Sequence, residues 1–592
     1  MNKQDYDILN ILLQKSFTNQ RTLAKDSGYS LGAVNKTLKV LTEENYINSN
    51  GQPTEKTQKE LLEKQPKNAI ILAAGFGMRM IPINLEMPKA LLEIKGEVLI
   101  ERIIRQLHEA GIHNISIVVG FMKEHFEYLI DDFGVELIVN EQYSAKNNLY
   151  SVKLVCDRLE NTYIIPCDIW CASNPFNQTE LYSWYMVSDI IDPDSTVHVN
   201  RKNELVSIKS GIGGNQMIGI AYLLKKEAEQ VRSKIEFLSK STENNSLFWE
   251  EALFKSGKMI TAAKVVPSNQ AVEINTYEQL REVDSNSNHL NSEVIDIIST
   301  ALQVNKNEIA NITTLKKGMT NRSFLFTVHK KRYIMRIPGE GTDQLINRQQ
   351  EAAIYEKIQS RNICDDPIYL NPENGYKITA FWENSRNCDP SNQEDVKKCL
   401  EKLRAIHNLK LHVDHEFDLF KQIDFYESLW GNTNSVYRDY VKTKQHIFSL
   451  KPFIDRHASK KVLTHIDAIP DNFLFIPSED GTEDLRLLDW EYAGMQDPHV
   501  DIAMFCIYCF YNRKQIDAVI DFYFHGMCPA ATRIKIYCYI SICGLLWSNW
   551  CEYKRNLGVE FGEYSLRQYR YAKEYYKLAS EEIELLGENN HE

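Results

Sequence analysis

The chain has 592 residues but lacks a long hydrophobic run. Its most apolar stretch, Ile536 to Trp547, is about half the roughly 20 residues that a bilayer-spanning helix requires, so it predicts a buried helix. An N-terminal signal pattern is also missing, because Met1 to Asp7 leads directly into a polar-studded helix pattern. We therefore expect a cytoplasmic protein without a membrane segment.

The cysteines lack the spacing of a disulfide or zinc framework. Twelve of them are scattered along the chain, which suits free thiols in a reducing compartment. Cys506 and Cys509 form a lone C-x-x-C pair, and a zinc site would need two further ligands. Free cysteine behaves as a small hydrophobic residue, so we interpret this pair as core packing.

The chain has no excess of positive charge. A net charge of -12 argues against bulk binding of nucleic acid or of anionic membranes. Hydrophobic content of 43% and charged content of 25% are ordinary for a soluble globular protein. The length is too great for one core and predicts several domains.

Residues 1–64 have the pattern of a small helical domain. Helices are expected over Asp7–Leu13, Thr22–Gly28 and Leu31–Glu44, and a small hairpin over Asn45–Gly51. Ser30 can cap the third helix, and Gly28 marks the turn before it. This order resembles the winged helix-turn-helix of bacterial regulators.

The resemblance makes DNA a candidate partner of this domain. Residues 1–65 hold nine Lys or Arg and eight Asp or Glu, so the segment offers few cations for phosphate contacts. The expected recognition helix carries Lys36 and Lys39. A homodimer would double this weak patch, and a protein-contact or vestigial domain is the alternative.

Residues 66–284 alternate short apolar strands with helices. Strands are expected at 68–73, 115–119, 135–139 and 162–166, with helices at 98–110 and 123–131. Such alternation predicts a Rossmann-like α/β domain with a parallel sheet between helices. Asp284 to His289 is polar and rich in turn formers, and we expect a linker there.

Residues 292–592 begin with a helix, followed by strands at 312–315, 323–328 and 333–337. After Gln344 the pattern becomes mainly helical. A small strand-rich lobe before a large helical lobe is the order of a bilobal, protein-kinase-like domain. The chain is thus expected to be a multidomain protein of α/β and α+β classes.

The first chemical motif is Ile-Leu-Ala73-Ala74-Gly75-Phe-Gly77-Met-Arg79, followed by Pro-Lys89. Glycines directly after a strand let backbone N–H groups approach phosphate oxygens. The run resembles the sugar-nucleotide pyrophosphorylase-like nucleotidyltransferases over about 66–284. The resemblance implies that this loop binds a nucleoside triphosphate. It also implies that Arg79 and Lys89 hold the phosphates and stabilise the charge on departing pyrophosphate.

The same resemblance implies a Mg²⁺ site. Asp168 ends a strand where the family carries a metal-binding aspartate, and a hard cation prefers such oxygen ligands. The family's second acidic pattern is Glu-Ile-Asp, whereas this chain has Glu273-Ile-Asn275. Glu273 matches the pattern and Asn275 departs from it, which weakens the expected metal site.

The acceptor segments resemble those of bacterial choline-phosphate cytidylyltransferases. They carry Asn148 and Tyr150 in one run and Trp249 and Glu250 in another. A quaternary ammonium is best held by aromatic faces near a carboxylate. Trp170, Trp249 and Tyr150 are the candidates for that cage and Glu250 for the counter-charge. Aromatic residues of a core and a sugar-1-phosphate acceptor are the alternatives.

The second motif is His465-x-Asp467-x₄-Asn472, followed by Asp489-Trp-Glu. It resembles the catalytic loop of the choline kinase and aminoglycoside phosphotransferase family, over about 305–580. The resemblance implies that Asp467 accepts or orients the proton of the substrate hydroxyl. Asn472 and Asp489 are implied to hold Mg²⁺ against the phosphates.

The small lobe of this domain supplies the expected nucleotide contacts. A short turn at 317–321, with Thr320 and Asn321, could cover the phosphates. Arg336 lies where a protein kinase has its phosphate-contacting lysine, and Glu351 could pair with it.

Aromatic residues of the large lobe indicate the substrate class. Trp547 and Trp550 share one face of a helix, and Tyr492 follows Asp489 closely. A choline-like substrate would use them as a cation–π wall, and core packing is the alternative. An aminoglycoside would instead require an acidic cleft.

Together the motifs predict a bifunctional enzyme. ATP and choline would give phosphocholine, and CTP would convert it to CDP-choline and pyrophosphate. Ethanolamine in place of choline is one alternative, and a sugar kinase joined to a sugar nucleotidyltransferase is another. The third is a transcriptional regulator whose degenerate enzyme domains sense ligands.

Overall fold

The computed structural model describes residues 1–15, 17–83, 87–209, 211–290, 292–315, 321–339, 342, 344–431, 433–478, 480–556 and 561–588. They form two compact units, residues 1–296 and residues 297–592. Helix α10 (Glu293–Leu302) crosses the division between them. The cysteines are all free thiols, as the sequence predicts.

The N-terminal helices form a winged helix-turn-helix. The helices are α1 (Lys3–Gln14), α2 (Gln20–Ser27), α3 (Leu31–Glu43) and α4 (Glu55–Glu63). Gly28 ends α2 with a φ of 69°, and the Ser30 side chain accepts from the N–H of Ala33 to begin α3. The expected hairpin is one bridge between Ile47 and Pro53. The sequence pattern did not indicate α4, because this helix is mainly polar and Thr57 is its buried residue.

This small domain packs against the α/β domain of the same unit. Leu181 joins the core formed by Ile8 and Leu41. The Tyr182 hydroxyl donates to Asp7 at 2.7 Å, and Lys64 Nζ donates to the Leu181 carbonyl at 3.0 Å. Buried apolar contact combined with hydrogen bonds makes the winged helix a docked part of the unit.

The α/β domain is built on a ten-stranded mixed sheet with the order β5-β4-β1-β6-β11-β8-β13-β10-β9, with β12 paired to β13. Its strands are β1 (Asn68–Ala73), β4 (Ile115–Val119), β5 (Glu136–Val139), β6 (Thr162–Pro166), β8 (Trp184–Asp192), β9 (Val197–Val199), β10 (Glu204–Ser207), β11 (Gly214–Leu223), β12 (Phe254–Lys255) and β13 (Lys258–Val266). Strands β5, β4, β1 and β6 are parallel. The predicted parallel sheet is therefore correct for this half, and antiparallel strands extend it.

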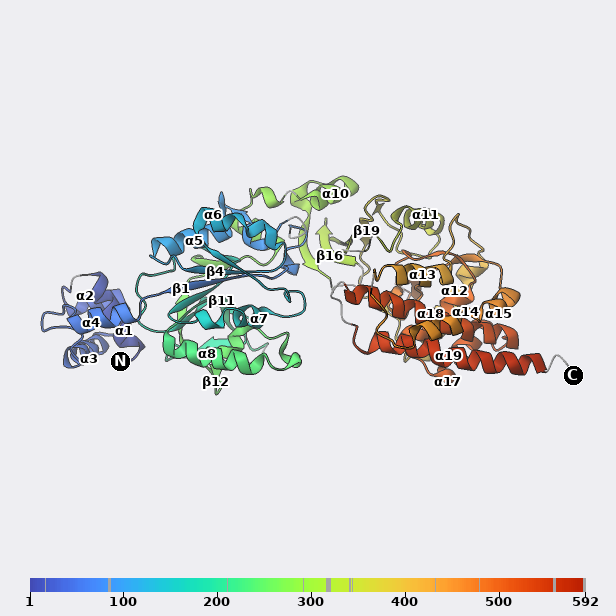
Figure 1. The fold of residues 1–592 in the computed structure, drawn as a ribbon. Helices are drawn as coiled ribbons and strands as arrows, with labels where there is room; N and C mark the ends of the chain where they lie inside the picture. Colours follow the sequence, from blue (N-terminus) through green and yellow to red (C-terminus); the bar gives the residue numbers. More distant parts are fainter. Residues whose placement is uncertain are drawn as a thin grey trace. The chain divides into compact units, whose positions relative to one another are not determined.

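Helices cover both faces of this sheet. They are α5 (Leu99–Glu109), α6 (Tyr128–Phe133), α7 (Asn148–Lys153), α8 (Lys225–Leu238) and α9 (Tyr277–Val283). Helices α5 and α6 lie on one face, and α7 and α8 lie on the other (Figure 1). The pairs β2 (Glu93–Ile94) with β3 (Glu97–Val98), and β7 (Ile169–Cys171) with β14 (Ala271–Glu273), lie outside the sheet. Loops that follow β1 and β6 emerge at the same edge, where α/β sheets bind ligands.

The second unit begins with a five-stranded antiparallel sheet of order β15-β16-β17-β19-β18. Its strands are β15 (Ala310–Thr314), β16 (Asn321–Val328), β17 (Lys331–Pro338), β18 (Tyr369–Leu370) and β19 (Lys377–Ala380), followed in the chain by β20 (Arg386–Asn387). Helix α11 (Arg348–Ile358) belongs to this lobe. A small sheet with one helix is the expected first lobe of a kinase-like domain.

The larger lobe is mainly helical. Its elements are α12 (Gln393–Asn408), α13 (Leu419–Ser428), α14 (Tyr440–Phe448), α15 (Lys451–His457), β21 (Val462–Thr464), β22 (Phe473–Pro477), β23 (Glu483–Leu487), β24 (Gly494–Gln496), α16 (His499–Tyr508), α17 (Arg513–Phe524), α18 (Ala530–Asn556) and α19 (Glu563–Glu588). The run Ile536 to Trp547 is buried within α18, as predicted. Across the described ranges, every helix falls short of the length and apolarity needed to cross a membrane.

Two candidate active sites

A cavity of about 1350 Å³ lies at the edge of the sheet where β1 and β6 end. The residues that line its phosphate end include Ala73, Ala74, Gly75, Gly77, Arg79, Lys89 and Asp168. Gly77 has a φ of 67°, and a side chain there would meet Lys89. Glycine thus allows the loop to turn beside the cation, and the structure brings the predicted nucleotide residues into one cavity.

Lys89 is the central cation of this cavity. Its side chain is buried and forms an ion pair with Asp168. Its Nζ also donates to Asn275 Oδ1 at 2.6 Å, and Arg79 Nη2 donates to the same oxygen at 3.0 Å. Two cations from separate loops therefore converge on one amide, at the place where the motif predicts a triphosphate.

Two carboxylates lie beside these cations. Asp168 Oδ1 is buried without a hydrogen-bond partner among the described residues. Burial, and then the Asp168 charge, raises the pKa of Glu273. In the described part of the chain, no group of three or more His, Cys, Asp or Glu residues is arranged to hold a metal ion. A pair of carboxylates still suits Mg²⁺, which binds one or two of them together with substrate phosphates.

Glu250 also lines this cavity. The Tyr185 hydroxyl donates to Glu250 Oε1 at 3.2 Å, while Glu250 Oε2 is buried without a partner among the described residues. Burial raises the pKa of Glu250 to about 7. Asn148 Oδ1 accepts from the backbone N–H of Trp249 at 2.8 Å, which fixes the backbone just before Glu250. An orphaned carboxylate oxygen facing a cavity suits a cationic ligand.

Three predicted aromatic residues do not line this cavity. The Arg102 guanidinium lies over Trp170, 4.2 Å from the centre of its ring. Trp249 is fully buried in the core, and Lys146 Nζ lies 4.4 Å from the Tyr150 ring. Protein groups cover these rings, so the structure does not bring the three predicted cage residues together on the cavity lining. The aromatic residues that line the cavity are Phe76, Tyr143, Tyr185, Phe248 and Phe254.

The second site is built around the loop between β21 and β22. Asn472 Nδ2 donates to the backbone carbonyl of Asp467 at 2.9 Å and to the Asp467 carboxylate at 3.3 Å. Asp501 accepts from the backbone N–H groups of His465 and Ile466. These bonds hold the loop on helix α16, so Asp467 and Asn472 are positioned together as the motif predicts.

Charged residues of the small lobe contact Asp489 and Glu491, in the segment that follows β23. Arg336 pairs with Glu351 at 2.6 Å and approaches Asp489 at 3.4 Å. Arg348, which no sequence motif indicates, pairs with Glu351 at 3.0 Å and with Glu491 at 3.3 Å. Arg336, for which the motif predicts a phosphate contact, is thus oriented by carboxylates.

Of the predicted phosphate-covering turn at 317–321, only Asn321 is among the described residues. Thr320 lies outside the described residues. Asn321 Nδ2 donates to Glu491 at 3.0 Å, so its amide links β16 to the segment that follows Asp489.

Carboxylates crowd the second site. Burial raises the pKa of Asp467 to about 8, and the nearby charges of Asp489 and Glu491 add to the shift. Burial likewise raises the pKa of Glu491 to about 7. Clustered carboxylates with raised pKa values are typical of a site that binds a cation or exchanges a proton.

Several aromatic side chains of the large lobe pack near the catalytic loop. Tyr492 lies 5.6 Å from Trp547, and Trp547 lies 5.5 Å from Trp550, both edge to face. Burial raises the pKa values of Tyr426 and Tyr564, and the Asp467 charge contributes to each shift. No sequence motif indicates these two tyrosines, because α13 and α19 approach the catalytic loop only in the folded chain.

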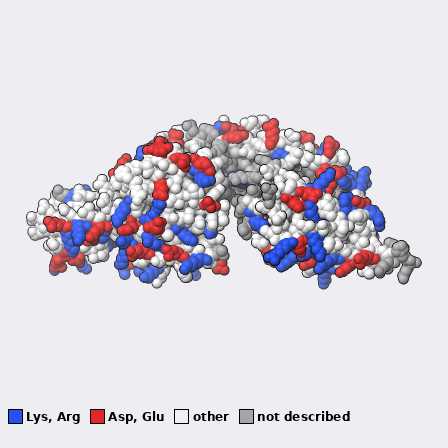
Figure 2. All heavy atoms as spheres, viewed as in Figure 1, with Lys and Arg blue, Asp and Glu red and all other residues white. Residues whose placement is uncertain are grey.

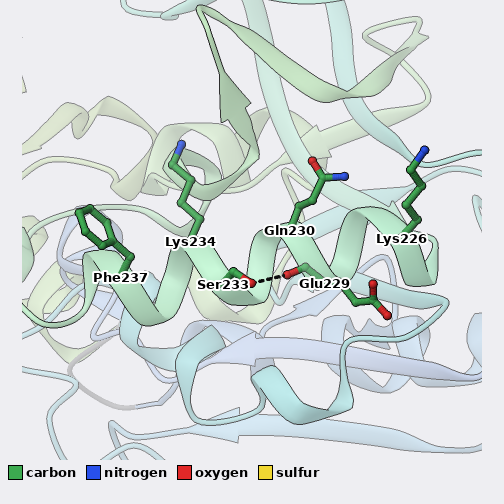
Figure 3. A pocket seen from close by; sticks show the side chains of 6 residues that line it. All are labelled: Lys226, Glu229, Gln230, Ser233, Lys234 and Phe237. Atoms are coloured by element: carbon green, nitrogen blue, oxygen red, sulfur yellow. Dashed lines mark hydrogen bonds between the residues drawn. The ribbon is translucent and has the colours of Figure 1, made fainter.

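A shallower depression lies on helix α8. The residues that line it are Lys226, Glu229, Gln230, Ser233, Lys234 and Phe237 (Figure 3). They all come from one helix, and the Phe237 side chain is largely exposed. This surface brings together no residues from distant parts of the chain, unlike the two sites above.

Comparison with known proteins supports both sites. Residues 69–181 match the family profile of the MobA-like NTP transferase domain, and residues 312–521 match that of choline/ethanolamine kinase. Residues 1–48 match the profile of winged helix-turn-helix DNA-binding domains. The chain thus combines nucleotidyltransferase and kinase domains, which makes it a transferase.

Individual relatives agree with these profiles. A choline-phosphate cytidylyltransferase of Streptococcus pneumoniae is 32% identical over 37% of this chain and 99% of its own length. Protein LicA of Haemophilus influenzae is 25% identical over 42% of this chain and 96% of its own length. The crystal structure of choline kinase LicA from Streptococcus pneumoniae is 28% identical and covers 48% of this chain and 99% of its own, with a TM-score of 0.42. The chain belongs to the family of bacterial choline-phosphate cytidylyltransferases, and it joins such a domain to one of choline/ethanolamine kinase type and to a winged helix-turn-helix.

Proposed function

We propose that the chain phosphorylates choline with ATP and then transfers CMP from CTP to the phosphocholine. We assign residues 1–64 to the winged helix, 66–284 to the cytidylyltransferase and 292–592 to the kinase. The observation that carries this proposal is the presence of two assembled phosphate-handling sites in one chain. Lys89, Asp168 and Arg79 form the first, and Asp467 and Asn472 belong to the second.

In the kinase step, the hydroxyl oxygen of choline attacks the γ-phosphorus of ATP. The hydroxyl proton passes to Asp467, and the bond from the γ-phosphorus to the bridging oxygen breaks to release ADP. Arg336, held by Glu351, contacts the phosphates. Asn472 and Asp489 are the residues that would bind Mg²⁺.

In the transferase step, a phosphate oxygen of phosphocholine attacks the α-phosphorus of CTP, and pyrophosphate leaves. Lys89 and Arg79 stabilise the charge on the phosphates as the bond breaks. Asp168 and Glu273 are the carboxylates that would hold Mg²⁺, since the Asn275 side-chain oxygen accepts from Lys89 and Arg79. When bound, this ion neutralises phosphate charge and so favours departure of pyrophosphate.

Both sites offer recognition for a cationic head group. The unpartnered oxygen of Glu250 supplies a counter-charge in the first site, and Tyr492, packed edge to face on Trp547, lies near Asp467 in the second. A trimethylammonium group is attracted to such rings by their electrostatic quadrupole. A neutral sugar would lack the charge attraction that both features offer to a cation.

Mass spectrometry of the products tests the proposal. The full chain is incubated with choline, ATP, CTP and Mg²⁺, and CDP-choline is the expected product. Parallel reactions contain ethanolamine, a sugar panel or UTP. Formation of a nucleoside-diphosphate sugar without CDP-choline would replace the proposal, and no product from any mixture would favour a ligand-sensing regulator.

Replacing Trp547 with leucine is expected to raise the KM for choline about tenfold to thirtyfold, because a desolvated cation–π contact contributes up to about 2 kcal/mol. Trp547→Phe keeps an aromatic face and is the matched control, with a smaller effect expected. The KM for ATP, measured in the same assay, should change little. Equal KM increases for choline and ATP would instead indicate a general packing defect.

DNA is the second partner that we propose, through helix α3. Asn35, Lys36 and Lys39 lie exposed on one side of this helix. Figure 2 shows both signs of charge mixed over the visible surface, so binding should be weak and lost at moderate salt. Fluorescence anisotropy with a pool of genomic fragments at low salt tests this, and an equal signal from a Lys36→Glu/Lys39→Glu variant would refute it.

A further inference from the structure

Asn275 occupies an unusual electrostatic position in the transferase cavity. It is buried and follows strand β14 directly. Its backbone N–H donates to Gln279 Oε1 at 2.7 Å, and Thr276 then caps helix α9. Because the backbone is fixed on both sides, the side chain has a defined direction into the site.

The Asn275 amide connects groups of opposite charge. Its Oδ1 accepts from Lys89 Nζ at 2.6 Å and from Arg79 Nη2 at 3.0 Å. The same side chain is hydrogen-bonded to Glu273, and this bond opposes the effect of burial on the pKa of that carboxyl group. An amide can accept from cations and donate to a carboxylate at once, whereas an ionised carboxylate can only accept.

The neutrality of Asn275 affects how much charge the cavity presents to phosphates. Lys89 and Arg79 supply two positive charges, and Asp168 and Glu273 are the carboxylates beside them. An aspartate at position 275 would add a negative charge in direct contact with both cations. The Asn275 amide instead orients both cations without cancelling their charge.

We propose that Asn275 is a positioning residue that keeps Lys89 and Arg79 available to the triphosphate, so that CTP binds before any divalent cation does. The inference rests on the proposed function of this cavity. Lys89 and Arg79 then supply the initial attraction for the triphosphate. Mg²⁺ is then needed for the transfer step rather than for nucleotide binding.

Isothermal titration of the full chain with CTP tests this, once in EDTA and once in Mg²⁺. Excess AMP occupies the kinase domain during both titrations. The unmodified chain should bind CTP in EDTA with a Kd within about tenfold of the value in Mg²⁺. Asn275→Asp should weaken binding in EDTA by at least about tenfold, because a charge in direct contact opposes the triphosphate, and Mg²⁺ should restore most of the loss.

Matched variants separate charge from structure. Asn50→Asp makes the same charge change in an exposed turn of the winged helix, away from the cavity, and should leave both Kd values within about twofold. Asn275→Ala removes the amide without adding charge, so its two Kd values should change by a similar factor.

Three outcomes would decide against the inference or its basis. CTP binding by the unmodified chain only in Mg²⁺ would overturn the inference, as would equal affinity of Asn275→Asp and the unmodified chain in EDTA. If the unmodified chain binds no CTP under either condition, the proposed function of this cavity fails first.

Discussion

Replacing Asp467 with asparagine is expected to lower the rate of choline phosphorylation by about 10² to 10⁴, the usual contribution of general acid–base catalysis. The change removes the proton acceptor but keeps the size of the side chain and a partner for Asn472. Cytidylyl transfer from CTP to added phosphocholine should remain unchanged. Both rates are measured on the same preparation, with ADP release and pyrophosphate release as readouts.

A control and a second measurement sharpen this expectation. Asp480→Asn changes an exposed carboxylate in the turn between β22 and β23, and both activities should survive it. Equal loss of the two activities in Asp467→Asn would point to misfolding. Retention of kinase activity would remove Asp467 from the mechanism.

Thermal unfolding in EDTA provides the second measurement. The folded-state pKa of Asp467 is raised to about 8 from its ordinary value of 3.8. Between these values the folded chain holds a proton that the unfolded chain has released, so stability falls as the pH rises from about 4 to 8. Asp467→Asn lacks this titration, and its advantage in melting temperature over the unmodified chain should increase across that range.

Local motifs explain why much of both sites could be predicted from sequence. A glycine loop after β1 and an aspartate after β6 must meet, because β1 and β6 are adjacent parallel strands. Asp467 and Asn472 are joined by one short loop, so their proximity follows from five residues of spacing. In each case, short-range geometry determines which functional groups meet.

The aromatic residues were harder to predict, because their role depends on what covers each ring. Trp170 and Trp249 have the right residue type near the right motif, yet Arg102 covers one and the core encloses the other. Tyr185 contacts Glu250 from a strand sixty-five residues away. Tyr426 likewise reaches the kinase site from a separate helix, and no sequence spacing links it to Asp467.

Replacing Lys89 with methionine is expected to lower cytidylyl transfer by about 10² to 10³, the usual cost of losing one preorganised charge at a transition state. Methionine keeps the length of the side chain but leaves Asp168 without its buried ion partner. Kinase activity should be retained, because Lys89 belongs to the first unit and the kinase loop to the second. Pyrophosphate release and ADP release, assayed in parallel, measure the two effects.

The comparison variants for Lys89 separate position from charge. Lys123→Met removes an exposed lysine that pairs with Glu124, and transfer should stay within about twofold, as surface ion pairs contribute little. Lys89→Arg keeps the charge but places a larger, planar group in a buried site, so only part of the activity should return. If Lys89→Met loses less than about threefold, the charge of this side chain is not used in the transition state. The convergence of Lys89 and Arg79 on Asn275 would then serve nucleotide binding alone.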